Sequence, residues 1–465
     1  MSTINTIPGP RGHWLLGSLR ELRRDPLEFY SRMAREFGDV VSYRLGPHPV
    51  VLVSRPDLIE QVLVTDNKHF IKHYALRLLR PILGNGLITS DGSFWLRQRR
   101  LIQPAFNRQR IESYAGVMVE LTDRLLATWR DGETRDLHAD MMQLALGIVS
   151  KTLLDVDAGD RYSEVASAIE VILNDFDERF RSAFPPPFWL PLVPRNRRLK
   201  AAVRHLDAII ETIIGQRRAE RGDRGDLLSL LIEARDEEDA TGMTDRQLRD
   251  EVMTMFLAGH ETTANALAWT WSLLATHPAV ADRLRDELAS ALDGRPPTAA
   301  DVPHLVYTGQ ILQESMRLYP PAYTFGREAT ADVELGGYRI RKGTTVLISQ
   351  WVMHRDPRFF ERPDAFDPDR WSAACGKGVP RYAYFPFGGG PRTCVGNSFA
   401  MLEATLVLAT IASRFQVTLA PGAAIAPRAS VTLRPQNGVP CVIHRRDAGG
   451  WATTGNAARP VRTGT

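Results

Sequence analysis

The sequence predicts a mainly α-helical protein with small β-sheets, an α+β fold in one compact unit. Apolar residues recur at helical spacing over most of the 465 residues, whereas two stretches alternate apolar and polar residues around a turn, as hairpin strands do. No internal repeat or long linker divides the chain. We therefore expect residues 1–446 to form a single domain with a small β-rich part near the N-terminus, followed by a disordered tail at 447–465.

The two stretches with strand character are residues 39–53 and 331–349. The first, DVVSYRLGPHPVVLV, alternates around a Gly-Pro-His-Pro turn, and the second, ADVELGGYRIRKGTTVLIS, turns at Gly336 and Gly337. Paired glycines favour tight hairpin turns because they adopt positive φ without strain. We expect one antiparallel hairpin at each place.

The longest helix is expected between Thr244 and His277. Thr244 and Gln247 have the spacing of a capping box, and Pro278 ends the segment. At 1.5 Å per residue this helix is roughly 50 Å long, enough to cross the molecule. Its centre, AGHETT at 258–263, places a glycine and polar groups in an apolar middle. Glycine and threonine have low helix propensity, which predicts a local distortion there.

Two further helices are expected in the second half of the chain. Pro278 begins PAVADRLRDELASALDG, for which Gly294 is the expected C-terminal cap. Residues 397–415, NSFAMLEATLVLATIASRF, form the other helix, and it starts just after the glycine-rich segment YFPFGGGPRTCVG. The amino terminus of this helix therefore lies beside Cys394.

Composition excludes several classes of protein. The chain is 44% hydrophobic and lacks any apolar run long enough for a membrane span. Its net charge is +4 and no block of five or six like charges appears, so we expect no nucleic-acid partner. Three cysteines, Cys375, Cys394 and Cys441, are too few for a disulfide framework and indicate a reducing compartment. We expect a cytoplasmic monomer.

Cys394 has the setting of a ligand, although a buried structural role is the usual default for a free cysteine. Glycines at 388, 389, 390 and 396 remove side chains near the sulfur, so a flat, bulky group could approach the backbone. Amides at the following helix N-terminus would favour a thiolate. No second Cys or His stands nearby at zinc-ligand spacing. These features predict an anionic sulfur ligand for a large planar group.

The segment at 387–396, FGGGPRTCVG, matches the pattern FxxGxRxCxG and resembles the haem-binding signature of the cytochrome P-450 family. Other family motifs follow in order along almost the whole chain: WxxxR at Trp95–Arg99, AGHETT at 258–263, ESMR at 314–317 and FDPDRW at 366–371. One such motif recurs by chance, whereas four in order, together with an intact cysteine signature, are specific. The resemblance implies the cytochrome P-450 fold, with the long helix crossing the haem.

The resemblance implies that Cys394 is the axial ligand of the iron of haem b, and that its electron donation favours cleavage of O2. Phe387 would pack near the sulfur, and Gly396 belongs to the same loop. Two carboxylates of the haem need cations. The residues implied at that edge of the haem are Trp95, Arg99, Arg392, Arg327 and Lys72.

Two further groups of residues take roles from the resemblance. Ala258 and Gly259 would leave room for O2 in the long helix, and Glu261 with Thr262 would relay protons to it. Glu314 and Arg317, paired with Arg370, would form a buried structural network behind the haem, because a buried charge without its partner costs about 3–5 kcal/mol.

The activity implied is that of a haem-thiolate monooxygenase, which inserts one oxygen atom of O2 into a C–H bond of a hydrophobic small molecule. The apolar, proline-rich loop at 184–194, with Phe184, Phe188 and Trp189, favours lipophilic substrates such as fatty acids or terpenoids. A fatty acid would need an anchoring cation, for which Arg77 or Arg80 is available, whereas a terpenoid would need none.

No reductase sequence is fused to these motifs, so electrons would come from a separate ferredoxin or flavodoxin with its NAD(P)H reductase. Several arginines around WxxxR would form a basic docking surface for it, or simply a solvated helix face: Arg97, Arg99, Arg100, Arg108 and Arg110. Two alternative functions remain, that of a haem-thiolate peroxygenase or isomerase and that of a non-catalytic haem sensor. The intact pair Glu261 and Thr262 argues against both.

Overall fold

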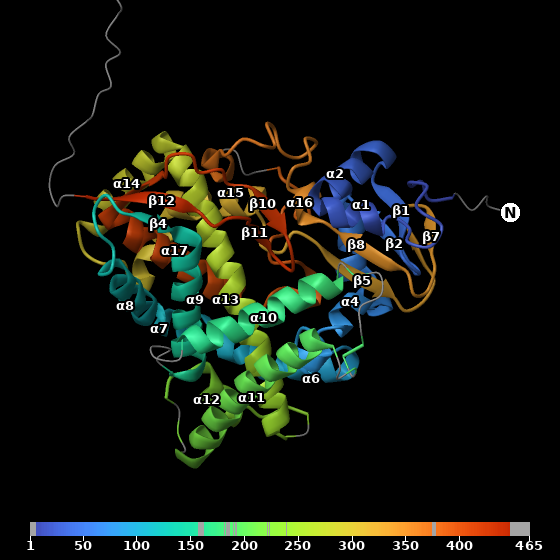
Figure 1. The fold of residues 1–465 in the computed structure, drawn as a ribbon, viewed down its shortest axis with the longest axis horizontal. Coiled ribbons are helices and arrows are strands. Elements are labelled where there is room, and N and C mark those ends of the chain that lie inside the picture. Colours follow the sequence, from blue (N-terminus) through green and yellow to red (C-terminus); the bar gives the residue numbers. More distant parts are fainter. Residues whose placement is uncertain are drawn as a thin grey trace, which may run out of the picture.

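The computed structural model describes residues 6–446 apart from 157–161, 181, 183–186, 189, 191, 192, 221, 223, 239 and 374–377. Helices form most of this chain, while the largest sheet lies at one side of the molecule and a smaller sheet at the opposite side (Figure 1). The predicted class, mainly α with small sheets, is confirmed. The predicted tail at 447–465 lies outside the described residues, as do Cys375, Phe184 and Trp189.

Seventeen α-helices lie in the described part of the chain. They are α1 (Leu19–Arg24), α2 (Pro26–Phe37), α3 (Pro56–Glu60), α4 (Tyr74–Arg77), α5 (Arg80–Leu83), α6 (Gly92–Ile102), α7 (Arg108–Ser113), α8 (Ala115–Leu126), α9 (Leu137–Leu154), α10 (Tyr162–Phe180), α11 (Pro194–Glu220), α12 (Leu227–Glu233), α13 (Asp245–Thr276), α14 (Pro278–Leu292), α15 (Val306–Leu318), α16 (Gln350–Met353) and α17 (Asn397–Arg414). None of the described helices is both long and apolar enough to span a bilayer.

The predicted long helix is α13, which runs through the centre of the molecule (Figure 1). Its capping box is present, since the Gln247 amide donates to Thr244 Oγ1 at 3.2 Å and Gln247 Oε1 accepts from the Thr244 amide at 2.9 Å. Helices α9, α11, α15 and α17 pack against it. Because neighbours cover most of α13, a sequence that is apolar around most of the helix is stable there.

The helix after Pro278 ends slightly earlier than predicted. Asp293, and not Gly294, is the C-cap of α14, with a left-handed φ of 46°. Aspartate tolerates this conformation because its short polar side chain can bond the local backbone. Gly294 follows with a φ of 76°, so both residues share the turn that ends the helix.

The main sheet has the strand order β1-β2-β8-β5-β3. Its strands are β1 (Val40–Leu45), β2 (His48–Val53), β3 (Phe70–Lys72), β5 (Phe325–Ala329) and β8 (Thr345–Ile348). The hairpin predicted at 39–53 is confirmed as β1 and β2. The sheet is not confined to the N-terminal region, because β5 and β8 come from the second half of the chain. Both faces of β2 are buried, and alternate valines face two different core clusters.

The second predicted hairpin is shorter than the stretch 331–349. It consists of β6 (Val333–Leu335) and β7 (Tyr338–Ile340), joined by Gly336 and Gly337, both at positive φ. Residues 345–348 pair instead with β2 in parallel and with β5 in antiparallel orientation. The fully buried apolar run TVLI is typical of a central strand, which explains why it leaves the exposed hairpin.

Two smaller sheets complete the β structure. One is β4 (Thr134–Asp136), β12 (Pro440–Arg445) and β9 (Phe415–Leu419), and the other is the hairpin of β10 (Pro427–Ala429) and β11 (Leu433–Pro435). The turn of this last hairpin lies against the middle of α13, because the Trp269 indole donates to the Leu433 carbonyl at 2.9 Å. A segment from the C-terminal part of the chain thus reaches the central helix.

Candidate functional site

The Cys394 loop is held by backbone contacts. The Cys394 amide donates to the Phe387 carbonyl at 3.0 Å, and the loop leads through η6 (Gly390–Arg392) into α17, whose N-cap is Gly396. A Cβ on Gly390 would lie 1.9 Å from the Leu63 carbonyl oxygen, and one on Gly389 would lie 2.4 Å from the Tyr382 ring. These two glycines therefore serve packing within the protein, which corrects the prediction that all of them clear space for a bound group.

The Cys394 sulfur is exposed, whereas the Cys441 side chain is buried in β12. Loss of hydration nevertheless raises the pKa of the Cys394 thiol. The hydrogen bond from the Gly396 amide and the charge of Arg99 lower this pKa, but by less. A side chain that is open to water and still partly desolvated lies in a recess of the protein. A free sulfur here stays a thiol at neutral pH, and a bound metal ion would stabilise the thiolate.

Three cations meet near this loop. The antiparallel register of β3 and β5 places Lys72 directly opposite Arg327, and Arg392 approaches from the Cys394 loop. Lys72 is buried, and its ammonium group donates to the Leu87 carbonyl at 2.6 Å. Trp95 on α6 lies beneath two of these charges, with its ring centroid 5.9 Å from Lys72 Nζ and 4.4 Å from Arg392 Cζ.

Asp91, the N-cap of α6, is the carboxylate that pairs with this cluster. It accepts from Arg392 at 2.8 Å. Desolvation and the charge of Arg392 lower the pKa of Lys72 to about 7, and the same causes lower the pKa of Arg327 to about 10. Arg392 Nη1 is buried and makes no hydrogen bond within the described protein. The cluster thus fits a bound group that carries more than one negative charge.

The central helix is open at one place. From Leu248 to Leu274 every residue of α13 is buried except Leu257, Ala258, Gly259 and Thr262. Ala258 and Thr262 are one turn apart and share a face of the helix. The small residues of the AGHETT motif therefore open onto space that the rest of the helix does not face.

Glu261 and Thr262 of this motif point in different directions. The Thr262 hydroxyl donates to the Ala258 carbonyl at 2.6 Å, and α13 stays α-helical, so the predicted distortion at 258–263 is not found. The bond satisfies the hydroxyl within the helix without breaking it. Glu261 is buried and accepts from the Thr432 hydroxyl at 2.8 Å. Burial raises the pKa of Glu261, and the Thr432 hydrogen bond lowers it.

Glu314 and Arg317 form a fully buried ion pair on α15. Both guanidinium contacts to the carboxylate measure 2.8 Å, and Arg317 also donates to the His354 carbonyl at 2.8 Å and the Ala365 carbonyl at 2.9 Å. Arg370 approaches Glu314 at 3.4 Å, as the family resemblance implies. The Trp371 indole completes the carboxylate's partners at 2.9 Å. Each charge of the network is thus met by several partners.

Comparison with known proteins agrees with this geometry. The family model described as Cytochrome P450 matches residues 7–442. Cyclooctatin synthase of Streptomyces melanosporofaciens is 41% identical over 428 residues, which cover 91% of this chain and 92% of that protein. Pentalenene oxygenase of Streptomyces avermitilis is 36% identical over 421 residues, which cover 90% and 93%.

The chain belongs to the cytochrome P450 family. The crystal structure of the cytochrome P450DA heme domain superposes with a TM-score of 0.88 at 29% identity, over 96% of this chain and 98% of that chain. The predicted cytochrome P450 fold is therefore confirmed, and the protein is an oxidoreductase of the monooxygenase type.

Cytochromes P450 bind haem and use O2, and bound haem supplies the oxidising chemistry. The residues of this chain fit the group. Cys394 would hold the iron, and Lys72, Arg327 and Arg392 would meet the haem carboxylates. Trp95 lies with these cations, while the half-buried Phe387 is placed beside the cysteine by its carbonyl.

Arg99 lies on the cysteine side of the site. Its guanidinium donates to the Thr393 carbonyl at 2.9 Å, next to Cys394. The other arginines predicted near it are largely occupied: Arg97 donates to Thr241, Arg100 pairs with Asp236 and Glu238, and Arg108 pairs with Glu112. Contact of Arg99 with the haem stays a prediction.

Sequence reasoning missed Asp91, Trp371 and Thr432. Asp91 could have been found, because an aspartate four residues before Trp95 is a typical helix N-cap. Trp371 stands next to Arg370 within the quoted motif FDPDRW. Thr432 carries no sequence signal, because only the fold brings the β10–β11 turn to α13.

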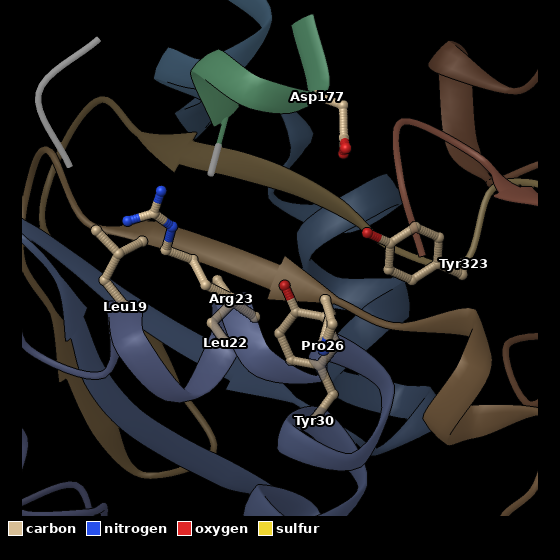
Figure 2. A pocket seen from close by; sticks show the side chains of 7 residues that line it. All are labelled: Leu19, Leu22, Arg23, Pro26, Tyr30, Asp177 and Tyr323. Atoms are coloured by element: carbon tan, nitrogen blue, oxygen red, sulfur yellow. The ribbon is translucent and has the colours of Figure 1, made fainter. Parts of the chain in front are cut away.

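A separate small pocket is lined by Leu19, Leu22, Arg23, Pro26, Tyr30, Asp177 and Tyr323. Figure 2 shows it between α1, α2 and the end of α10, where Tyr30 and Tyr323 lie below Asp177. Its cavity of about 10 Å³ has room for about one water molecule. It is therefore too small to hold a substrate.

We expect Cys394→Ser to abolish the far-red-shifted Soret band of the reduced CO complex, because a hydroxyl group does not supply a thiolate ligand. Absorption spectroscopy of the purified protein measures this band. Cys441→Ser is the matched control, since this thiol lies in β12 away from the Cys394 loop, and it should keep the band. A Cys394→Ser protein with an unchanged band would refute the ligand assignment.

Glu314→Gln should destabilise the protein by about 3–5 kcal/mol, because it leaves the buried Arg317 without its counter-charge. Thermal unfolding and the haem content of the purified protein report the loss. Glu112→Gln removes an exposed ion pair with Arg108 and should leave the stability nearly unchanged, because water screens this pair. Similar stability of the two variants would show that the buried network has no structural role.

Proposed function

We propose that the protein is a haem b monooxygenase that inserts one oxygen atom of O2 into a C–H bond of a cyclic terpenoid. The observation that carries this proposal is the combination of the Cys394 recess with the cation cluster and the local opening of α13. Similarity to cyclooctatin synthase and pentalenene oxygenase over about nine tenths of the chain supports a terpenoid as the substrate.

Neither of the two arginines predicted to anchor a fatty acid is well placed to bind a carboxylate, which supports a neutral substrate. Arg77 forms an ion pair of 2.7 Å with Glu328, and Arg80 is exposed and donates to the Thr89 carbonyl at 3.3 Å. A substrate carboxylate would have to compete with Glu328 for Arg77 or leave the protein interior to reach Arg80. A terpenoid makes no such demand, because its binding rests on burial of apolar surface.

The polar groups of α13 support a reaction that needs protons. Thr262 lies at the opening of the helix, and Glu261 is the adjacent titratable group. Burial raises the pKa of Glu261, so its carboxyl holds a proton more readily than an exposed one and can pass it on. We therefore assign Glu261 and Thr262 to proton delivery, beside Ala258 and Gly259 as the residues that leave room for O2. A peroxygenase, an isomerase or a haem sensor would not need this pair.

Members of the family receive electrons from redox partners, and we propose a separate ferredoxin or flavodoxin with its NAD(P)H reductase. Such acidic partners would meet the face around Arg99, where the loop of Cys394 also lies. The ion pairs of Arg100 and Arg108 reduce the positive charge that this face can offer. We further propose that the enzyme acts as a cytoplasmic monomer, in keeping with its low cysteine content.

We expect pentalenene to shift the haem absorption spectrum of the purified enzyme, and palmitic acid and its methyl ester to bind with equal affinity, because Arg77 is paired with Glu328 and Arg80 is exposed. Spectral titration measures all three, and mass spectrometry after turnover with isotopically labelled O2 detects a product with one labelled oxygen. If the acid alone shifts the spectrum, the substrate is a charged lipid and the terpenoid proposal is wrong.

A further inference from the structure

A row of hydrogen bonds leads away from Glu261 on the face of α13 that carries Asn265. Glu261 accepts from the Thr432 hydroxyl at 2.8 Å, and Asn265 Nδ2 donates to the same hydroxyl oxygen at 3.0 Å. Asn265 Oδ1 lies 2.9 Å from His138 Nε2 at the start of α9. Glu261, Thr432 and Asn265 are buried, while His138 is half-buried.

The row fixes the direction of the Thr432 hydroxyl. An amide nitrogen only donates, so the Asn265 bond occupies a lone pair of Thr432 Oγ1. The hydroxyl hydrogen is then free to point at Glu261, which as a carboxylate only accepts. The His138 imidazole contributes a donor to Asn265 Oδ1 when its Nε2 carries a proton, and this contact holds the amide in the orientation that the row needs.

The backbone around Thr432 is held in place from several sides. The Trp269 indole donates to the Leu433 carbonyl, the Leu433 amide donates to the Pro321 carbonyl at 2.9 Å, and the Tyr323 hydroxyl donates to the Ser430 carbonyl at 3.0 Å. The β10–β11 turn therefore cannot move away from α13 without breaking several bonds. Thr432 presents its hydroxyl to Glu261 from a fixed position.

Glu261 depends on this donor. Burial raises the pKa of Glu261 and the charge of Asp177 raises it further, whereas the Thr432 hydrogen bond and the charge of Arg434 lower it. The Glu261 carboxyl and the Thr262 hydroxyl leave the helix in different directions, so their cooperation requires a defined resting place for the acid. Thr432 is the group that provides this place.

We propose that Thr432 is a positioning residue for Glu261, and that Asn265 and His138 orient its hydroxyl. Thr432 holds the acid of the proton-delivery pair in place and keeps it ready to ionise. This inference rests on the assignment of Glu261 and Thr262 to proton delivery, and it is independent of the identity of the substrate. A residue of the C-terminal hairpin thus takes part in a function that the sequence motif assigns to α13 alone.

The test measures the peroxide released per NADPH consumed by the haem-loaded enzyme, supplied with a ferredoxin and its NADPH-dependent reductase in the absence of substrate. Thr432→Val keeps the shape of the side chain and removes the hydroxyl. We expect a several-fold larger share of peroxide, approaching that of Thr262→Ala, because reducing equivalents leave as peroxide when protons arrive poorly. Thr432→Ser restores the hydroxyl and should return the share to that of the unaltered enzyme.

Three further variants separate positioning from a general loss of structure. Thr270→Val removes another buried hydroxyl farther along α13 and should leave the peroxide share unchanged. Thr432→Val combined with Glu261→Gln should release the same share as Glu261→Gln alone, because Thr432 acts through Glu261. Asn265→Asp replaces the donor to Thr432 by an acceptor and should raise the share, so it tests the same row should Thr432→Val fail to fold.

An unchanged peroxide share in Thr432→Val would overturn the proposal. So would a rise on adding Thr432→Val to Glu261→Gln that equals the rise that Thr432→Val causes alone. If Thr262→Ala and Glu261→Gln also leave the share unchanged, the assignment of proton delivery itself is wrong. If the peroxide share rises in those two variants but not in Thr432→Val, the proton-delivery assignment stands and only the role of Thr432 is wrong. The outcome for pentalenene binding does not enter this test.

Discussion

Buried positive charge is the constraint around which the site is built. Lys72, Arg327 and Arg392 come from three distant parts of the chain, and each loses hydration where they meet. Asp91 pairs with Arg392, yet Lys72 keeps a pKa of only about 7 in this surrounding. Such a cluster is costly in a protein unless an anionic group binds there. Haem carries two carboxylates, which would pair with the cations, and its iron would be held by Cys394. One ligand would therefore account for both the cation cluster and the cysteine recess.

A second set of buried charges supports the segment that leads into the Cys394 loop. Arg317 holds the carbonyls of His354 and Ala365 while it pairs with Glu314, so α15 is tied to the segment that precedes the Cys394 loop. His354 in turn accepts from the Phe385 amide at 3.0 Å, and burial lowers its pKa to about 3, so it is a neutral acceptor. The network therefore positions the loop without adding a further charge near the sulfur.

The sequence predicts the parts of this site that lie within continuous motifs. The capping box of α13 and the β1–β2 hairpin follow from spacing and periodicity alone, and the buried pair on α15 follows from the family resemblance. The sequence does not predict the strand register that sets Lys72 opposite Arg327, since pairing between distant strands leaves no local pattern. The packing role of Gly390 against Leu63 and the bond from Thr432 to Glu261 are equally hidden, because both join segments far apart in the chain. The roles of the site residues thus come from the family resemblance, and their hydrogen-bond and ion-pair partners come from the fold.

The central claim is that the three cations hold the carboxylates of haem. Titration of the haem-free protein with haem and with haem dimethyl ester, in which both carboxylates are neutral, tests it most directly. The account predicts that haem binds more tightly than the ester by about tenfold or more, since hydrogen bonds to charged groups contribute about 1.5–3 kcal/mol each. Equal affinity of the two compounds would contradict it.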